Sequence, residues 1–309
     1  MVINGPEQSL LKISKTYYMK KNPLFPAIII IFSLFSCVKN PLNDQEFSHL
    51  NIDDCLSPTS LNTFDILSWN IKTFPLEGNI TINLISEIIK KEDADLIALQ
   101  ELSGKADFDL LVQKLPDWSG EIAEFSDLNL AFLFKTSEVN LIGDPVTLFE
   151  NNDDAFPRSP LQITAEHHLG LRIFLINVHL KCCPGPENEK RRRKASIELK
   201  TYIDERLPNE KVIILGDFND EIYALDSSEN VFYNFIIDSL NYRFTDLSIA
   251  RGDSKLWSYP SWPGHIDHIL ITNELFEYEI TTQTLAYDIC DSSYFSYISD
   301  HRPIMIKIK

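Results

Sequence analysis

Residues 211–220 read KVIILGDFND, and the rest of the chain can be placed around this stretch. Four apolar residues, three of them β-branched, run without interruption to Gly216, which predicts a strand buried on both faces. Asp217, Asn219 and Asp220 follow directly. Because ligands bind at the carboxyl ends of strands in α/β sheets, these polar residues are candidates for a site. An ordinary strand-to-loop turn is the competing interpretation.

Two earlier apolar segments end in the same way. FDILSWNI, residues 64–71, carries Asn70 near its end, and DLIALQ, residues 95–100, is followed by Glu101. Apolar residues at helical spacing between positions 80 and 91 predict a helix that connects these two strands. Each polar residue alone could be a cap or a turn residue.

A third segment, LRIFLINVHL at residues 171–180, predicts a strand with Asn177 and His179 on one face. A core histidine bonded to a neighbour would be the commoner outcome for such a residue. Upstream, prolines on both sides of Arg158 favour an extended segment. Its guanidinium matches two phosphate oxygens, and a surface arginine in a loop is an equally good interpretation.

The C-terminal part of the chain adds acids and a histidine. Asp267 lies inside the apolar segment HIDHILI, residues 265–271, where a charge is costly unless it is paired. We therefore expect a partner such as a histidine. Asp300 and His301 stand just before a predicted final strand at residues 303–308.

The N-terminal region predicts export. Residues 19–36 have a positive start and a short apolar core, typical of a signal peptide, and Cys37 resembles the lipidated cysteine of bacterial lipoproteins. A plain secretory signal or an anchor helix is the alternative. We expect residues 1–18 to be an upstream extension, 37–62 a lipidated tether and 63–309 the folded domain. This places the protein on the membrane of the bacterial cell envelope.

Four cysteines remain after Cys37, and an exported protein can oxidise them. Cys182 and Cys183 are adjacent and rarely pair with each other, so we expect each of them to pair with Cys55 or Cys290 if disulfides form. No C-x-x-C spacing is present, which disfavours zinc.

Composition limits the class of function. The 309 residues are 44% apolar and carry a formal net charge of −17, which argues against a general polyanion binder. A basic run at residues 190–194 could touch a polyanion, although such a run usually forms a solvated face. We expect a monomer.

Taken in order, these segments resemble the endonuclease/exonuclease/phosphatase superfamily. The residues that carry the resemblance are Asn70, Glu101, Arg158, His179, Asp217, Asn219, Asp267, Asp300 and His301. The resemblance implies a four-layer α/β sandwich in which two mixed β-sheets pack face to face between helices.

The same resemblance implies roles for these residues. Glu101, with Asn70 and Asp300, would bind Mg²⁺ or Mn²⁺. Asp217 and Asn219 would orient water or phosphate, and His301, held by Asp267, would transfer protons. A further group would bind the scissile phosphate, namely Arg158, Asn177 and His179.

The implied activity is metal-dependent hydrolysis of phosphoric esters, with a nuclease of the DNase I type favoured. A phosphatase or phosphodiesterase acting on lipid or inositol phosphates is the alternative, and a catalytically silent binding lipoprotein is a third possibility. Abasic-site endonucleases typically have tyrosines where this chain has His179 and His268, which disfavours DNA repair.

Overall fold

The computed structural model describes residues 49–57, 62–125, 127–226 and 228–309. The predicted signal peptide, the lipidated Cys37 and most of the tether lie outside these residues. Within the described part of the chain, no helix is long and apolar enough to cross a membrane.

The first of two sheets has six strands in the order β12-β13-β1-β2-β4-β3. Its centre is the parallel pair of β1 and β2, and the other neighbours are antiparallel. The strands are β1 (Phe64–Phe74), β2 (Leu96–Leu102), β3 (Trp118–Ala123), β4 (Asn129–Lys135), β12 (Glu279–Thr284) and β13 (Ile304–Ile308).

The second sheet has seven strands in the order β10-β11-β9-β8-β7-β5, with β6 beside β7. Here β8 and β9 form the parallel pair. The strands are β5 (Val139–Leu141), β6 (Val146–Thr147), β7 (Leu161–His167), β8 (Arg172–His179), β9 (Val212–Asp217), β10 (Tyr242–Phe244) and β11 (Asp267–Thr272).

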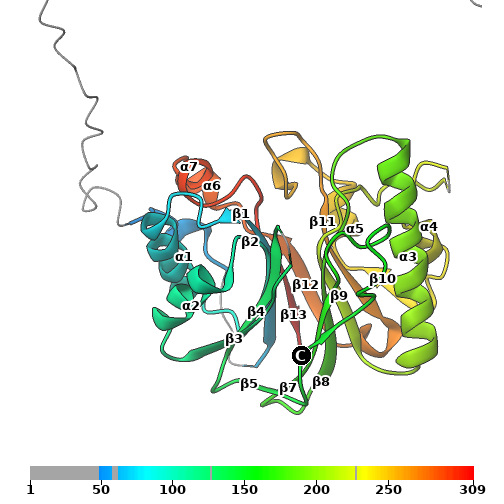
Figure 1. Cartoon of the computed structure of the whole chain (residues 1–309), viewed down its shortest axis with the longest axis horizontal. Coiled ribbons are helices and arrows are strands. Elements are labelled where there is room, and N and C mark those ends of the chain that lie inside the picture. Colours follow the sequence, from blue (N-terminus) through cyan, green and yellow to red (C-terminus); the bar gives the residue numbers. More distant parts are fainter. Residues whose placement is uncertain (1–48, 58–61, 126, 227) are drawn as a thin grey trace, which may run out of the picture. The chain divides into compact units, whose positions relative to one another are not determined.

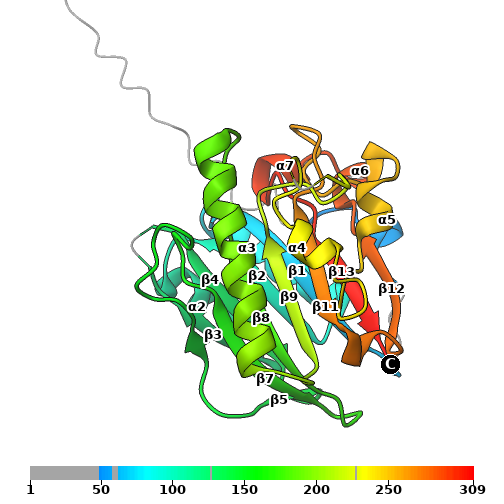
Figure 2. The same cartoon turned by 90° about the vertical axis from the view of Figure 1, so that its right-hand side faces the viewer.

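Helices cover the outer face of each sheet (Figure 1). α1 (Asn79–Glu92) and α2 (Lys105–Gln113) lie against the first sheet, and α3 (Pro186–Arg206) lies across the second beside β8 and β9 (Figure 2). The short elements are α4 (Tyr233–Ile236), α5 (Leu247–Ala250), α6 (Tyr287–Cys290), α7 (Tyr294–Tyr297) and the 3₁₀ turns Asp53–Cys55, Ser254–Leu256 and Asn273–Leu275. The predicted four-layer sandwich is confirmed.

Three apolar cores hold these layers together: one under α1 and α2, one between the sheets and one under α3. β1 contributes side chains to two of these cores. Phe64 and Ile66 lie between the sheets, whereas Leu67 and Trp69 lie under the helices, as the two-residue period of a strand requires. A strand buried on both faces must be apolar throughout, which explains the continuous runs in the sequence.

The disulfide prediction was wrong in its pairing. Cys55 is bonded to Cys290, which ties the turn before β1 to α6, and Cys182 and Cys183 are free thiols. Cys55 packs against the core of the first sheet. The adjacent cysteines instead follow β8 of the second sheet, so the fold brings neither of them to Cys55 or Cys290.

Candidate active site

Each strand that contributes to the site carries an inward-facing row of side chains that is apolar in the middle and polar at one end. In β9 the row runs Ile213, Leu215, Asp217, and in β11 it runs Ile271, Ile269, Asp267. The corresponding rows of β1 and β8 end in Asn70 and in Asn177 and His179. Because the two sheets face each other, the polar ends meet at one edge of the sandwich.

Asn70 joins the two sheets at this edge. Its buried amide nitrogen donates to Oε1 of Glu101 at 3.1 Å and to Oδ2 of Asp217 at 3.0 Å. The backbone N–H of Thr73 donates to the second oxygen of Glu101 at 3.0 Å. Two carboxylates from different sheets are therefore fixed side by side with their remaining lone pairs free to bind.

His301 and Asp267 form the predicted histidine–carboxylate pair. Nδ1 of His301 lies 2.8 Å from Oδ2 of Asp267, and Nε2 lies 3.9 Å from Oδ2 of Asp217. Burial by itself would lower the pKa of His301, but the charges of Asp267, Asp217 and Asp300 and the bond to Asp267 raise it to about 10. The imidazole is therefore protonated at neutral pH.

Asp217 is the buried carboxylate between the two histidines. Burial and the neighbouring Asp267 raise its pKa, against the opposite effect of His301. His179 lies on its other side, with Nε2 3.6 Å from Asp217 and 3.8 Å from Glu101. Burial, Arg158 and His301 lower the pKa of His179 well below its usual value, so this imidazole is neutral.

These side chains open into a cleft of about 650 Å³. Its lining includes six carboxylates, namely Glu101, Glu189, Asp217, Asp220, Glu221 and Asp300. The cations in the lining are Lys72, Arg192 and the protonated His301, so negative charge remains in excess. Such a lining repels a free phosphate ester unless an additional positive charge is present.

Strained backbone surrounds the cleft. Lys72, Thr73, Glu101, Cys183 and Asn219 all have positive φ angles and all line the cleft. Residues with side chains rarely adopt this region, and such strain gathers where a site must be held in one geometry.

Two groups of donor atoms at the cleft could hold a metal ion. Glu101, His179 and Asp217 present one donor each within 4.8 Å of one another, and so do Asp217, Asp267 and His301. Carboxylate oxygens suit Mg²⁺, and a mixed set of oxygen and imidazole nitrogen also suits Mn²⁺. The first group has the better chemistry, because His179 is neutral and can bind through nitrogen while His301 is protonated.

The other two predicted metal ligands lie differently. The carbonyl oxygen of the Asn70 side chain accepts the backbone N–H of Lys72, and its amide nitrogen faces the carboxylates. Asp300 forms an ion pair with Nζ of Lys72 at 2.8 Å. Asn70 therefore positions the two carboxylates, whereas Asp300 lines the cleft and is paired with Lys72.

Two of the predicted phosphate-binding residues lie behind the cleft. Asn177 lies two residues before His179 in β8 and is buried between the sheets. Its amide nitrogen donates to the carbonyl oxygens of Leu99 and Ala131, and its amide oxygen accepts from the side chain of Gln100. Arg158 is buried behind the site and donates to the carbonyl oxygens of His179 and Leu180. Neither side chain lines the cleft.

Asn219 lines the cleft as expected, but its amide nitrogen donates to the carbonyl oxygen of Leu180 at 3.2 Å. Its backbone N–H donates to Oδ1 of Asp217 at 2.8 Å. Asn219 therefore links the loop after β9 to the loop after β8 and holds Asp217.

A second histidine–carboxylate network lies behind the cleft, and no pattern in the sequence predicted it. Asp246 accepts hydrogen bonds from His265 at 3.0 Å and His268 at 2.6 Å, and all three side chains are buried. Nε2 of His268 lies 2.9 Å from the carbonyl oxygen of Asp220. The network supports the loop that carries Asp220 into the cleft, so His268 acts behind the site.

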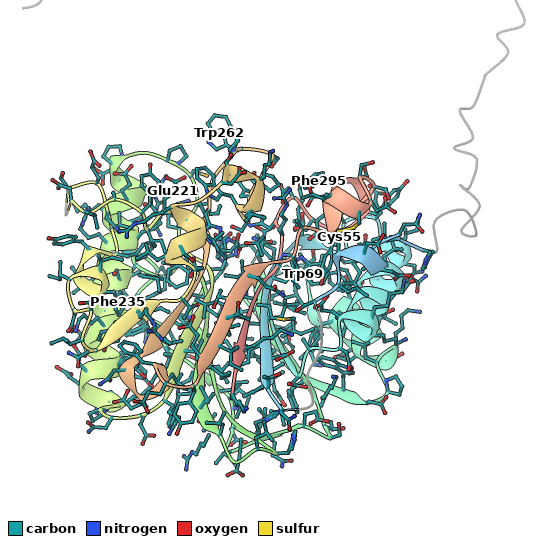
Figure 3. The ribbon with its side chains drawn as sticks, turned by 180° about the vertical axis from the view of Figure 1, so that it is seen from behind. Cys55, Trp69, Glu221, Phe235, Trp262 and Phe295 are labelled. Atoms are coloured by element: carbon teal, nitrogen blue, oxygen red, sulfur yellow. A yellow bond between two sulfur atoms is a disulfide. The ribbon has the colours of Figure 1, made fainter. Side chains whose placement is uncertain are left out.

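The proline-rich segment before β11 supplies an aromatic rim. Tyr259 packs on the ring of His301 with the ring centroids 4.6 Å apart. Trp262 also lines the cleft, is 77% exposed and projects from the end of the domain (Figure 3). An exposed tryptophan beside the cleft offers a flat surface to part of a substrate.

Known protein families and solved structures include matches to this chain. A sequence profile described as the Endonuclease/Exonuclease/phosphatase family matches residues 67–301. No curated protein sequence matches the chain.

Several solved structures are similar. D. rerio TDP2 complexed with single-strand DNA product is 13% identical, with a TM-score of 0.61 over 80% of this chain and 99% of that one. An endonuclease/exonuclease/phosphatase from Bacteroides vulgatus is 13% identical, with a TM-score of 0.59 over 80% and 98%. The human Nocturnin catalytic domain with bound sulfate is 16% identical, with a TM-score of 0.57 over 80% and 94%. At these identities the similarity concerns the fold alone.

Proposed function

The chain belongs to the Endonuclease/Exonuclease/phosphatase family, and we propose that, within this group of phosphoester hydrolases, it cleaves phosphodiester bonds of nucleic acid with the help of a divalent cation. The observation that carries the proposal is the arrangement around Asp217. On one side of Asp217 lies the carboxylate of Glu101, and Asn70 donates a hydrogen bond to each of the two. On the other side lies the protonated imidazole of His301.

The cation requirement rests on the charge of the cleft. Glu101, His179 and Asp217 would hold the ion, which would supply positive charge for the phosphoryl oxygens. Without it, a phosphate ester would meet the excess of carboxylates in the lining.

The chain's own residues can carry out the proton transfers. His301 is protonated and buried beside Asp267, so it can donate a proton or a hydrogen bond to an oxygen of the scissile group. The raised pKa of Asp217 belongs to the ion-free site, and binding of the ion would keep this carboxylate ionised as a ligand. Neutral His179 would bind the ion through Nε2, and the backbone N–H of Asn219 keeps Asp217 oriented.

Nucleic acid is favoured over other phosphate esters by the aromatic rim. A base that leaves a strand can stack on Trp262, and such stacking tolerates any sequence. D. rerio TDP2, which has the same fold, was solved with single-strand DNA product. The net charge of −17 argues for substrate capture by local contacts instead of a broad basic face.

One experiment tests the proposal. Purified protein is incubated with plasmid DNA, single-strand DNA, RNA, a phospholipid and an inositol phosphate, with Mg²⁺, with Mn²⁺ and with EDTA. We expect nucleic-acid cleavage that requires the metal and falls at least about 10²-fold in His301→Ala. His168→Ala, an exposed histidine paired with Glu138, is the matched control and should cleave normally. Cleavage of only the lipid or the inositol phosphate would reject the nuclease, and no cleavage with any substrate would reject the hydrolase.

The cellular location is part of the proposal. We infer export and lipidation at Cys37 from the sequence of residues 19–37. Metabolic labelling with a fatty acid should label the wild type and leave Cys37→Ser unlabelled.

A further inference from the structure

Two adjacent thiols lie in the wall of the cleft. Cys182 and Cys183 follow β8, three and four residues after His179, and both line the cleft. Their Sγ atoms are 2.7 Å apart, and neither belongs to a disulfide. Cys183 is exposed and Cys182 is partly buried, so a reagent in the cleft can reach the pair.

Local backbone geometry brings the two sulfur atoms together. Adjacent residues have Cα atoms about 3.8 Å apart, whereas most disulfides join Cα atoms at about 4.4–6.8 Å. Cys183 has a φ of 78°, in the left-handed region, and the two side chains lie on the same side of the chain. A bond between them would be strained, and strained or exposed disulfides are the ones that are readily reduced again.

A metal site is a poorer explanation of this pair. Among the described residues, no cluster of three or more donors that could hold an ion includes either cysteine. Two sulfurs alone make an incomplete site for zinc, which takes four ligands.

The cysteine segment is coupled to the base of the cleft through Arg192. The buried guanidinium donates to the carbonyl oxygens of Lys181 at 2.7 Å and Cys183 at 3.1 Å. It also holds Oδ2 of Asp220 at 2.9 Å. A change in the backbone at Cys183 therefore changes the support of a carboxylate that lines the cleft.

We propose that Cys182 and Cys183 are a reversible oxidation site, at which thiol–disulfide exchange with a low-molecular-weight disulfide closes a vicinal disulfide in the cleft wall. The exposed thiolate of Cys183 attacks one sulfur of the small disulfide, forms a mixed disulfide and releases one small thiolate. The Cys182 thiolate then attacks Sγ of Cys183, closes the ring and releases the second small thiolate. The two protons of the cysteine thiols pass to the two released thiols, so two cysteines are oxidised and one small disulfide is reduced.

The test reads the chemistry directly and does not depend on the proposed hydrolase activity. The full-length protein is equilibrated with oxidised glutathione, blocked with N-ethylmaleimide, digested without reduction and analysed by mass spectrometry. We expect the peptide with both cysteines to lack two hydrogens and to carry neither label nor glutathione. Graded dithiothreitol should reopen it before Cys55–Cys290, which serves as the internal reference.

Single variants separate ring closure from simple thiol reactivity. In Cys182→Ser and in Cys183→Ser the remaining thiol has no partner, so glutathione should stay attached to it. The proposal is overturned if the wild type also ends with glutathione on Cys183, or if both wild-type thiols remain fully open to N-ethylmaleimide after equilibration.

Discussion

Nδ1 of His301 lies 2.8 Å from Oδ2 of Asp267, and both side chains are buried at the base of the cleft. Asp267 is the first residue of β11, whereas His301 lies in the loop before β13 of the other sheet. This pair therefore spans the interface between the sheets, and its geometry depends on the packing of the whole sandwich.

The first prediction concerns the charge of Asp267. Asp267→Asn keeps the shape of the side chain and removes the charge that raises the pKa of His301 to about 10. The imidazole of the variant should lose its proton at lower pH. We expect hydrolysis to fall by about 10²-fold or more, and its alkaline limb to move to lower pH, in a pH–rate profile measured with whichever substrate the hydrolysis assay identifies.

Glu138→Gln is the control for that variant, because it removes a carboxylate from another histidine, His168, outside the cleft. Its pH–rate profile should match the wild type. An alkaline limb that stays in place in Asp267→Asn would show that His301 does not donate the proton.

The second prediction concerns metal binding without turnover. Glu101→Gln removes an anionic donor from the group formed with His179 and Asp217. We expect Mn²⁺ binding, measured by titration calorimetry in the absence of substrate, to weaken at least about tenfold, since even residues that only orient metal ligands have effects of this size.

Asp300→Asn and Glu221→Gln remove carboxylates that also line the cleft but belong to neither donor group. Mn²⁺ binding in these variants should stay within about threefold of the wild type, because only the local field changes. Equal losses in all three variants would mean that the ion is held by the general charge of the cleft.

The third prediction concerns Gly216, which precedes Asp217. Its φ is 145°, and an added Cβ would lie 2.0 Å from the carbonyl oxygen of Val178 on the neighbouring strand. Because backbone on both strands would have to move, Gly216→Ala should lose at least about 3 kcal/mol of unfolding free energy in urea titrations.

Gly170→Ala controls for the left-handed backbone alone, because its φ is 85° and no heavy atom lies within 4 Å of the added Cβ. Its cost should be about 1–2 kcal/mol. Similar losses in the two variants would contradict a close contact between β8 and β9 at Val178.

Much of this arrangement could be predicted from the sequence, because the central strands are buried on both faces. Such strands must be apolar, so Asp217 and Asp267 stand out at the ends of β9 and β11. β12 gives no such signal. It is an edge strand of sequence EITTQT with partly exposed side chains, and nothing in its pattern distinguishes it from a loop.

Residue type alone could not separate contact residues from their supports. Asn177 and His179 share one face of β8, but a difference of two positions encloses the first and opens the second to the cleft. Asp246 contacts His268 only because it follows β10, which pairs with β11, the strand that carries His268. Contacts of this kind depend on the three-dimensional path of loops, which no local pattern records.

The last prediction concerns Glu92, a buried acid that does not line the cleft. It is the last residue of α1, and its carboxylate accepts hydrogen bonds from the backbone N–H of Ser57 at 3.0 Å and the hydroxyl of Tyr287 at 2.8 Å. Burial raises the pKa of Glu92 to about 7, although these two hydrogen bonds act in the opposite direction. Between pH 4.5 and about pH 7, Glu92 therefore keeps its proton in the folded protein, whereas in the unfolded chain, where its pKa is the ordinary 4.5, it has lost it.

The sign of the pH effect follows from this difference. The contribution of Glu92 to stability is fully present below the unfolded pKa and is lost as the pH rises through about 7. Glu92→Gln cannot ionise, so its unfolding free energy relative to the wild type should improve by up to about 3 kcal/mol between acidic and mildly alkaline pH. Urea titrations across this range measure the difference, with Glu205→Gln, an exposed acid on α3, as the control for lost charge. A difference between Glu92→Gln and wild type that stays constant with pH would mean that the pKa of Glu92 is the same in the folded and the unfolded protein.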